Sequence, residues 1–109
     1  MDKEYLEKQI ISMLQPLNPE KVILFGSYAR NTMREESDID LYIVSKEDFI
    51  PATFAENMQH HKKYSRALKE LKKILPMDIL VHTRPMNRMF EESNSAFARE
   101  ILQHGERVL

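Results

Sequence analysis

The apolar run VILF at residues 22–25 limits most strongly what this chain can fold into. Short runs of β-branched, aliphatic and aromatic residues favour strands, and Gly26 ends this one. Because the run has no polar position, both faces of the strand are expected to be covered. Residues 38–44 alternate apolar and polar side chains and predict a second strand. The chain is therefore expected to build a sheet that helices cover on both sides.

Apolar residues at helical spacing surround these strands. Leu6, Ile10 and Leu14 recur after Asp2, a candidate cap, and predict a helix over residues 3–14. The other predicted elements are a single helix over 52–74, a third strand over 77–81, and two short helices over 86–92 and 95–104, the last ending at Gly105. This order predicts an α/β (α+β) fold, a small mixed sheet with flanking helices, in one domain over residues 1–109.

Composition excludes several classes of protein. The 109 residues include no cysteine, so disulfides and thiolate metal sites cannot form. Apolar runs reach four or five residues, whereas a membrane span needs roughly 20, so no membrane span is expected. The charged N-terminus lacks the apolar centre of a secretory signal, and a cytoplasmic protein is therefore expected.

A basic stretch over residues 56–73 carries six Lys or Arg residues and a single aromatic residue, Tyr64. Single-stranded nucleic acids bind where aromatic rings are interleaved with basic residues, so nucleic-acid binding is not expected here. Within this stretch His60 and His61 precede two lysines, and adjacent helical residues point in different directions. The two histidines are predicted to lie on a solvated helix face.

Asp38 and Asp40 stand two residues apart on a predicted strand, so their Cα atoms lie about 6.5 Å apart and their side chains share one face. Like charges on a partly buried surface repel each other unless protons or a cation neutralise them. Hard divalent ions with oxygen ligands do so, and such a pair can bridge two ions about 3.5–4 Å apart. Asp78, isolated in the third strand, is expected to join them as a third ligand.

Gly26 and Ser27 are expected to form the anion-binding side of the same site. A glycine after a buried strand lets the backbone approach a ligand closely, and the Ser27 hydroxyl and nearby amides can donate to phosphate oxygens. Arg30 and Arg34 would add positive charge.

Each of these residues also has a simpler interpretation. The aspartate pair could be a solvated strand start, and Asp78 could cap a turn or pair with Arg84. Ser27 could act only as a helix cap, a role that is compatible with phosphate binding. The two arginines could be solvated or ion-paired.

Together these residues resemble the minimal nucleotidyltransferase (MNT) family of the DNA polymerase β-like nucleotidyltransferase superfamily. The resemblance lies in Gly-Ser after a strand, ten intervening residues, Asp-Ile-Asp on an apolar strand, and a third aspartate on a later strand. The matching positions are Gly26, Ser27, Asp38, Asp40 and Asp78. The leading helix and the final EILQHGERVL also look like those of small family members.

Two positions depart from the family pattern. Asn31 stands where family members often have glycine, and asparagine also accepts left-handed backbone angles. Val108 and Leu109 stand where relatives commonly carry a tyrosine.

The resemblance implies a polymerase β-like fold and Mg²⁺-dependent transfer of a nucleoside monophosphate, usually AMP from ATP, to an acceptor hydroxyl. Asp38 and Asp40 would hold two Mg²⁺ ions. Asp78 would ligate the ion that activates the acceptor and take the acceptor's proton, while Gly26 and Ser27 would bind the triphosphate. Arg30, which is not one of the matching positions, is expected to assist nucleotide binding through its charge. Small family members often act as antitoxins beside a HEPN partner, some by attaching AMP to a toxin tyrosine, so a HEPN-type partner protein is implied.

Two other functions are compatible with the same resemblance. A non-catalytic binding module could neutralise a partner toxin by contact, although such a module has no need for three costly acids. Transfer to a small molecule such as an aminoglycoside usually needs an added acceptor-binding region, which a homodimer interface could supply.

Overall fold

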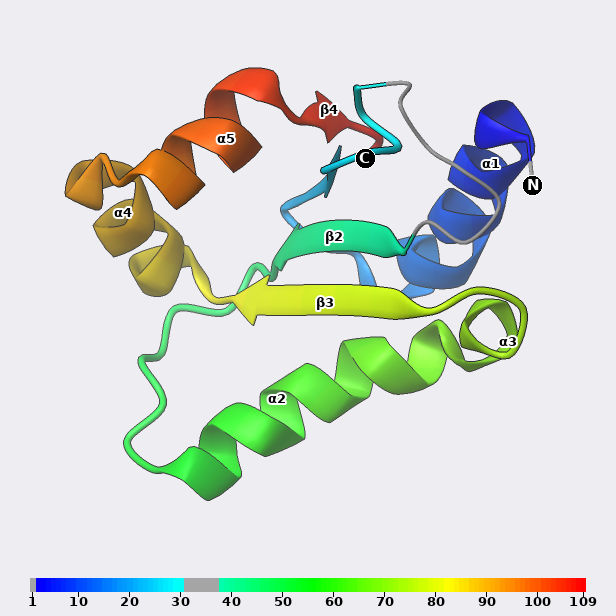
Figure 1. The fold of residues 1–109 in the computed structure, drawn as a ribbon. Coiled ribbons are helices and arrows are strands. Elements are labelled where there is room, and N and C mark those ends of the chain that lie inside the picture. The colour runs from blue at the N-terminus through cyan, green and yellow to red at the C-terminus, as the bar shows by residue number, and fades with distance from the viewer. Residues whose placement is uncertain (1, 31–37) are drawn as a thin grey trace.

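The computed structural model describes residues 2–30 and 38–109, so Asn31 and Arg34 lie outside the described residues. Its centre is a four-stranded mixed sheet in the order β3-β2-β1-β4 (Figure 1). The strands are β1 (Lys21–Phe25), β2 (Ile39–Val44), β3 (Met77–His82) and β4 (Glu106–Arg107). β1 pairs antiparallel with β2 and β4, whereas β2 and β3 are parallel. The three predicted strands are confirmed, and β4 is an addition.

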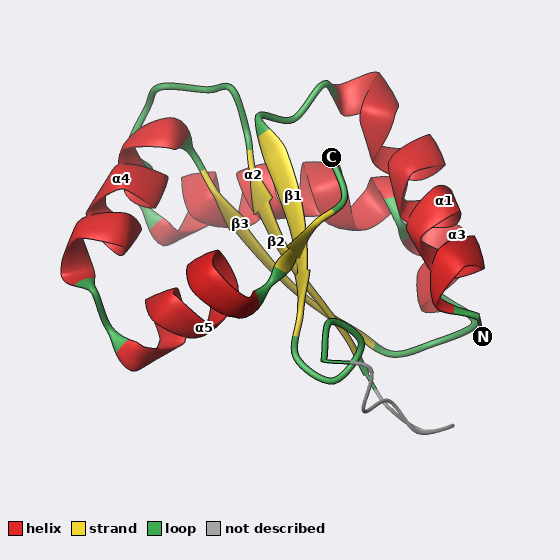
Figure 2. Ribbon diagram, turned by 90° about the horizontal axis from the view of Figure 1, so that it is seen from above, coloured by secondary structure: helices red, strands yellow, loops and turns green. Residues whose placement is uncertain are grey.

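Helices cover both faces of this sheet. They are α1 (Lys3–Leu14), the short 3₁₀ helix η1 (Gln15–Leu17), α2 (Phe54–Ala67), α3 (Lys69–Lys72), α4 (Arg84–Ser93) and α5 (Ala96–His104). Figure 2 shows the sheet with α4 and α5 on one side and α1 and α3 on the other. The predicted α/β fold with flanking helices is confirmed. No helix in the described part of the chain has the length and apolarity to span a bilayer.

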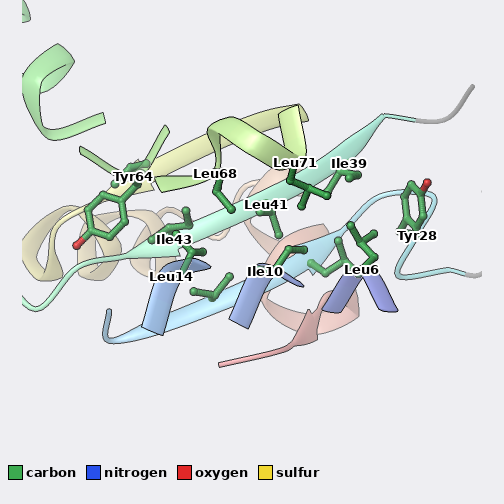
Figure 3. Packing of buried hydrophobic residues seen from close by; sticks show 13 residues of the cluster. Leu6, Ile10, Leu14, Tyr28, Ile39, Leu41, Ile43, Tyr64, Leu68 and Leu71 are labelled. Carbon is green, nitrogen blue, oxygen red and sulfur yellow. The ribbon is translucent and has the colours of Figure 1, made fainter. Parts of the chain in front are cut away.

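Alternation along the strands divides the core in two. In β2, Ile39, Leu41 and Ile43 face α1, α2 and α3, where Figure 3 shows them among apolar side chains of α1 and α3 and Tyr64 of α2. Tyr42 and Val44 point the other way and pack with residues of β1 and α5. All five side chains are buried. The four residues of the run at 22–25 are likewise buried in β1 and alternate between the two clusters, which confirms the predicted two-sided burial. The polar ends of the strands remain as the place for a site.

The prediction of one helix over 52–74 is wrong, because the chain divides at Leu68 into α2 and α3. The Leu68 side chain is fully buried, and its backbone leaves the helical region at ψ 9°. Buried residues at 64, 68 and 71 recur at the same spacing in a continuous helix and in this broken one. Periodicity therefore could not reveal the break.

The predicted solvated face at His60 and His61 is also wrong. His60 is only 5% exposed, and its Nε2 lies 3.0 Å from Ser45 Oγ. His61 Nε2 lies 3.2 Å from the carbonyl oxygen of Ile79, on β3. Because α2 packs along β3, both imidazoles contact the sheet region, whereas the two lysines that follow them remain exposed.

Candidate active site

The predicted site residues meet at one end of the sheet, where β1 ends and both β2 and β3 begin. Strand register places Asp40 between Phe25 of β1 and Asp78 of β3. An open cavity of about 480 Å³ lies at this end. It is lined by Phe25, Gly26, Ser27, Arg30, Asp38, Asp40, Asp78 and Glu100. All six residues predicted to form the site therefore line one cavity.

The three aspartates are close together because β2 and β3 run parallel and in register. Asp40 and Asp78 are direct neighbours across the two strands, and Asp38 lies one residue before β2. Asp38 and Asp78 are exposed, whereas Asp40 is half-buried. Burial, followed by the negative charges of Asp78 and Asp38, raises the pKa of Asp40 to about 6. The electrostatic conflict that the sequence predicted is thus present at Asp40.

These carboxylates suit a hard divalent ion in their chemistry. Burial and the neighbouring carboxylates raise the pKa of Asp40, and an Mg²⁺ ion bound by oxygen ligands would offset these negative charges. Within residues 2–30 and 38–109, no three His, Asp or Glu side chains are placed to hold a metal ion in their present rotamers. Binding would therefore require the aspartate side chains to turn toward a common point in the cavity.

Two features require a glycine at position 26: its backbone angle and the nearby side chain of Asp40. Its φ of +73° lies in the left-handed region, which side chains with a Cβ disfavour. A Cβ at this position would lie 2.3 Å from Asp40 Oδ2. The Arg30 amide donates to the Gly26 carbonyl oxygen at 3.2 Å, which closes the turn after β1. This turn brings Ser27 and Arg30 to the same cavity as the carboxylates.

Arg30 forms an ion pair inside the site. Its Nη1 donates to Glu100 Oε1 at 2.8 Å, and both side chains are partly exposed. Among the described residues that line the cavity, Arg30 is the one lysine or arginine. The ion-paired interpretation of Arg30 is therefore correct, and its position at the cavity keeps the nucleotide role open.

Glu100 belongs to the site although sequence reasoning missed it. It lies on α5, seventy residues from Arg30, and its charge also contributes to the raised pKa of Asp40. No motif marks this glutamate, because only the packing of α5 on β1 brings it to the cavity. The sequence offers only a weak signal for Glu100, namely that this acidic residue directly precedes a buried residue of the last helix.

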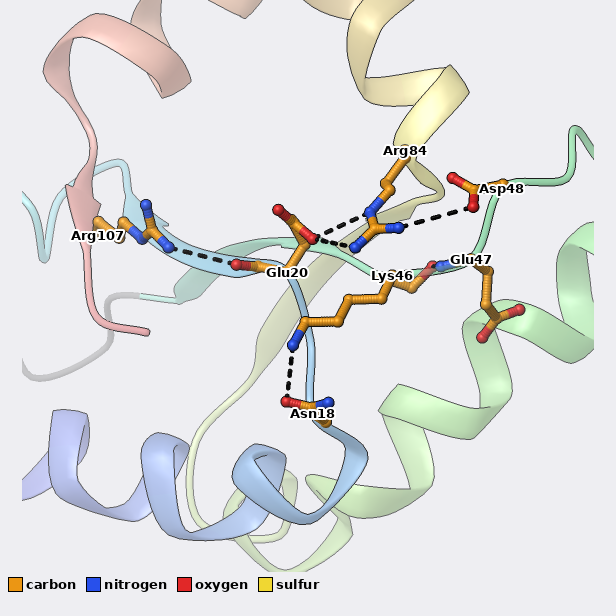
Figure 4. Close-up of polar contacts among 8 residues, drawn as sticks. Asn18, Glu20, Lys46, Glu47, Asp48, Arg84 and Arg107 are labelled. Atoms are coloured by element: carbon orange, nitrogen blue, oxygen red, sulfur yellow. Dashed lines mark hydrogen bonds and ion pairs between the residues drawn. The ribbon is translucent and has the colours of Figure 1, made fainter.

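The alternative partner considered for Asp78 is not observed. Arg84 instead donates from Nη2 to Glu20 Oε2 at 2.8 Å and lies 3.6 Å from Asp48 (Figure 4). This cluster follows the last residue of β3, whereas Asp78 lies near the first. Arg84 therefore neutralises carboxylates at the opposite end of the sheet and leaves Asp78 at the cavity.

Comparison with known proteins agrees with this geometry. The family model "Nucleotidyltransferase domain" matches residues 6–107. A curated relative, "Putative protein adenylyltransferase MJ0604" of Methanocaldococcus jannaschii, is 44% identical over 52 residues, which cover 45% of this chain and 52% of the relative. The chain thus matches about half the length of that relative.

Two solved structures share the fold. One, described as "the toxin-antitoxin with AMP-PNP", has a TM-score of 0.62 at 18% identity and covers 94% of this chain and 72% of its own. The other, "the toxin-antitoxin MntA-HepT", has a TM-score of 0.57 at 15% identity and covers 97% and 71%. At these identities the likeness shows a common fold.

Proposed function

The chain belongs to the nucleotidyltransferase domain family, and from this premise we propose that it transfers AMP from ATP to a hydroxyl group of a partner protein. In this reaction the acceptor oxygen bonds to the α-phosphorus while the bond from that phosphorus to pyrophosphate breaks. The observation that carries the proposal is the single cavity lined by three aspartates, a glycine-serine turn and an arginine. Phosphoryl-type transfer requires this combination of positioning and charge neutralisation rather than a protein nucleophile.

The residues that line the cavity would divide the work between them. Asp38, Asp40 and Asp78 would hold two Mg²⁺ ions, which when bound neutralise the triphosphate and lower the pKa of the acceptor hydroxyl. Asp78, exposed at the start of β3, would accept the acceptor's proton on its carboxylate. The backbone amides of the turn at Gly26 and the Ser27 hydroxyl would donate to phosphate oxygens, and Arg30 would turn from Glu100 to the triphosphate.

We propose a HEPN-type toxin as the partner and an antitoxin role for this chain. A relative that carries the name of a protein adenylyltransferase and two toxin-antitoxin structures with the same fold support this choice. A transferase that consumes ATP would work in the cytoplasm, where ATP and the toxin's targets both occur. The binding-module and small-molecule alternatives predict different outcomes in the experiment below.

The test is a labelling reaction with Mg²⁺ and ATP labelled at the α-phosphate, in the presence of host lysate or the product of the neighbouring gene. We expect the wild-type protein to label one discrete protein band and the Asp38→Asn/Asp40→Asn variant to label none. The matched control is Asp48→Asn, which removes an exposed carboxylate at the far end of the sheet and should label as the wild type does. ATP labelled at the γ-phosphate should leave the band unlabelled.

Two other outcomes would change the assignment. A wild-type protein that labels nothing with any of the four NTPs, yet still co-purifies with a partner, would be a binding module. Label that appears on a small molecule instead of a protein would identify a small-molecule transferase.

A further inference from the structure

The cavity holds the groups that a triphosphate needs, but it offers little surface for a nucleobase. Of the eight described residues that line it, seven are charged or are the small Gly26 and Ser27, and the remaining one is Phe25 at the end of β1. Phe25 is 8% exposed, so most of its ring is covered by neighbours. Phe25 therefore offers little ring surface to a nucleobase. Residues that pack next to Phe25 are the candidates for contact with the base.

Phe97 of α5 packs next to Phe25. Its ring centroid lies 5.9 Å from that of Phe25, with the two planes at 78°. Glu100, three residues later on the same helix, lines the cavity itself. Residues three apart on a helix share a face, so α5 directs Phe97 and Glu100 to the same side.

The Phe97 ring is held in place and yet open to solvent. It makes a second edge contact with Phe90 of α4, at 5.9 Å and 72°. Even so, 48% of Phe97 remains exposed. An exposed aromatic ring that two neighbours hold in position is suited to stacking. The ring loses little conformational freedom when a ligand binds.

The other exposed phenylalanines do not share this position. Phe54, 79% exposed, begins α2 on the far side of the loop that follows β2, and Phe49 contacts His60. In Figure 1 this loop and the start of α2 lie at the end of the sheet opposite the start of β2. Phe54 therefore serves as a matched control, an exposed phenylalanine that lies away from the cavity.

We propose that Phe97 is the platform on which the nucleobase of the bound NTP stacks. This inference rests on the proposed function and adds to it the residue that recognises the base. Every nucleobase has a π face, and one base stacked on an aromatic side chain changes affinity by about 5- to 100-fold. The carboxylates and the arginine of the cavity would bind a nucleotide and a simple polyphosphate equally well. Stacking on Phe97 would raise the affinity for the nucleotide alone.

The experiment compares two ligands, ATP and inorganic tripolyphosphate, by calorimetric titration of the protein in Mg²⁺. For Phe97→Ala we expect an affinity for ATP that is about 5- to 100-fold weaker and an affinity for tripolyphosphate within two-fold of wild type. Phe97→Leu, which keeps an apolar contact with Phe25 and Phe90 but has no ring, should behave like the alanine variant. Phe97→Tyr should retain ATP binding, and Phe54→Ala should leave both affinities unchanged.

The remaining outcomes overturn the inference in distinguishable ways. If wild type binds both ligands and Phe97→Ala leaves ATP affinity within two-fold, or weakens both ligands equally, Phe97 is no base platform while the proposed function stands. If Phe97→Ala and Phe97→Leu keep ATP affinity but lose labelling of the partner protein, the ring belongs to the acceptor surface instead. If wild type binds neither ligand, both the proposed function and this inference fail.

Discussion

At the scale of single residues, Asp40 is where function and stability conflict. The side chain is half-buried beside Asp78, Asp38 and Glu100, and burial with these charges raises its pKa to about 6. An unfolded aspartate titrates near 3.9, so the folded protein binds a proton more tightly than the unfolded chain does. This protonation stabilises the metal-free fold fully below about pH 4, and the stabilisation is lost as the pH rises through about 6.

Replacing this charge should therefore stabilise the protein while abolishing transfer. In EDTA at pH 7.5 we expect the free energy of unfolding of Asp40→Asn to be about 1 kcal/mol higher than that of wild type. This value allows for solvent screening, because Asp40 is partly exposed. At pH 4.5 the difference should shrink, because wild-type Asp40 is then mostly protonated. Calorimetric unfolding at both pH values measures this difference in stability. The control is Asp48→Asn, which should be no more stable than wild type. An Asp40→Asn variant less stable than wild type at pH 7.5 would contradict the predicted sign.

Gly26 is the second residue for which local geometry makes a clear prediction. Gly26→Ala places a Cβ at φ +73° and 2.3 Å from Asp40 Oδ2. We expect a loss of about 1–3 kcal/mol of stability and a strong loss of AMP transfer, because Asp40 must move. Urea unfolding measures the first effect. In Gly26→Ala/Asp40→Ala the clash is absent, so the loss should be smaller than the sum of the single changes; additive losses would locate the strain in the backbone alone.

At the scale of elements, the joint between α2 and α3 is set by tertiary packing rather than by a helix-breaking residue. Leu68, at the joint, is fully buried among residues of α1, α3 and the sheet. No proline or glycine lies between residues 54 and 72. The break allows α3 to lead the chain back to β3, which must run parallel beside β2 for Asp78 to meet Asp40.

Leu68→Ala should consequently destabilise the protein by about 2–5 kcal/mol, as expected for a leucine removed from a packed core. Ile74→Ala is the matched control, since Ile74 follows α3 and is 63% exposed, and its loss should stay within about 0.5 kcal/mol. Chemical denaturation of the three proteins measures both values. Equal effects of the two changes would mean that the joint is not packed as described.

At the scale of the whole molecule, the sheet separates two charged regions of different character. At one end, the described residues that line the cavity include four carboxylates and one arginine, whereas at the other end Arg84 pairs with Glu20 and Asp48. Each of these two carboxylates at the far end has a cationic partner, whereas carboxylates outnumber cations among the described residues that line the cavity. A ligand that brings divalent cations should therefore act on the stability of the whole fold through the cavity.

Mg²⁺ with ATP is expected to stabilise the folded wild-type protein by roughly 2.7 kcal/mol when the ligand is at 100 times its Kd, which raises the unfolding temperature by several degrees. Asp38→Asn/Asp40→Asn should show little of this shift, and Asp48→Asn should show all of it. Thermal unfolding with and without the ligand measures the difference. An equal shift in all three proteins would place nucleotide binding outside the cavity.

The local pattern of the chain was sufficient to predict three strands, the fold class and the six residues that meet at the cavity. Apolar spacing records which side chains face the core, and the Gly-Ser and Asp-Ile-Asp motifs are continuous in sequence, so both are readable without a structure. The short strand β4 and the break at Leu68 were not predictable in this way. A two-residue strand has no periodicity, and a buried leucine suits a continuous helix equally well.

What depended on folding is the set of contacts between distant parts of the chain. Parallel pairing of β2 with β3 brings Asp78 beside Asp40, and the packing of α5 on β1 brings Glu100 to Arg30 and Phe97 to Phe25. The packing of α2 along β3 buries His60, which sequence spacing placed in solvent. Residue types and local spacing thus identify the groups suited to the chemistry. Their distances, and with them the raised pKa of Asp40, arise only when the strands pair and the helices cover the sheet.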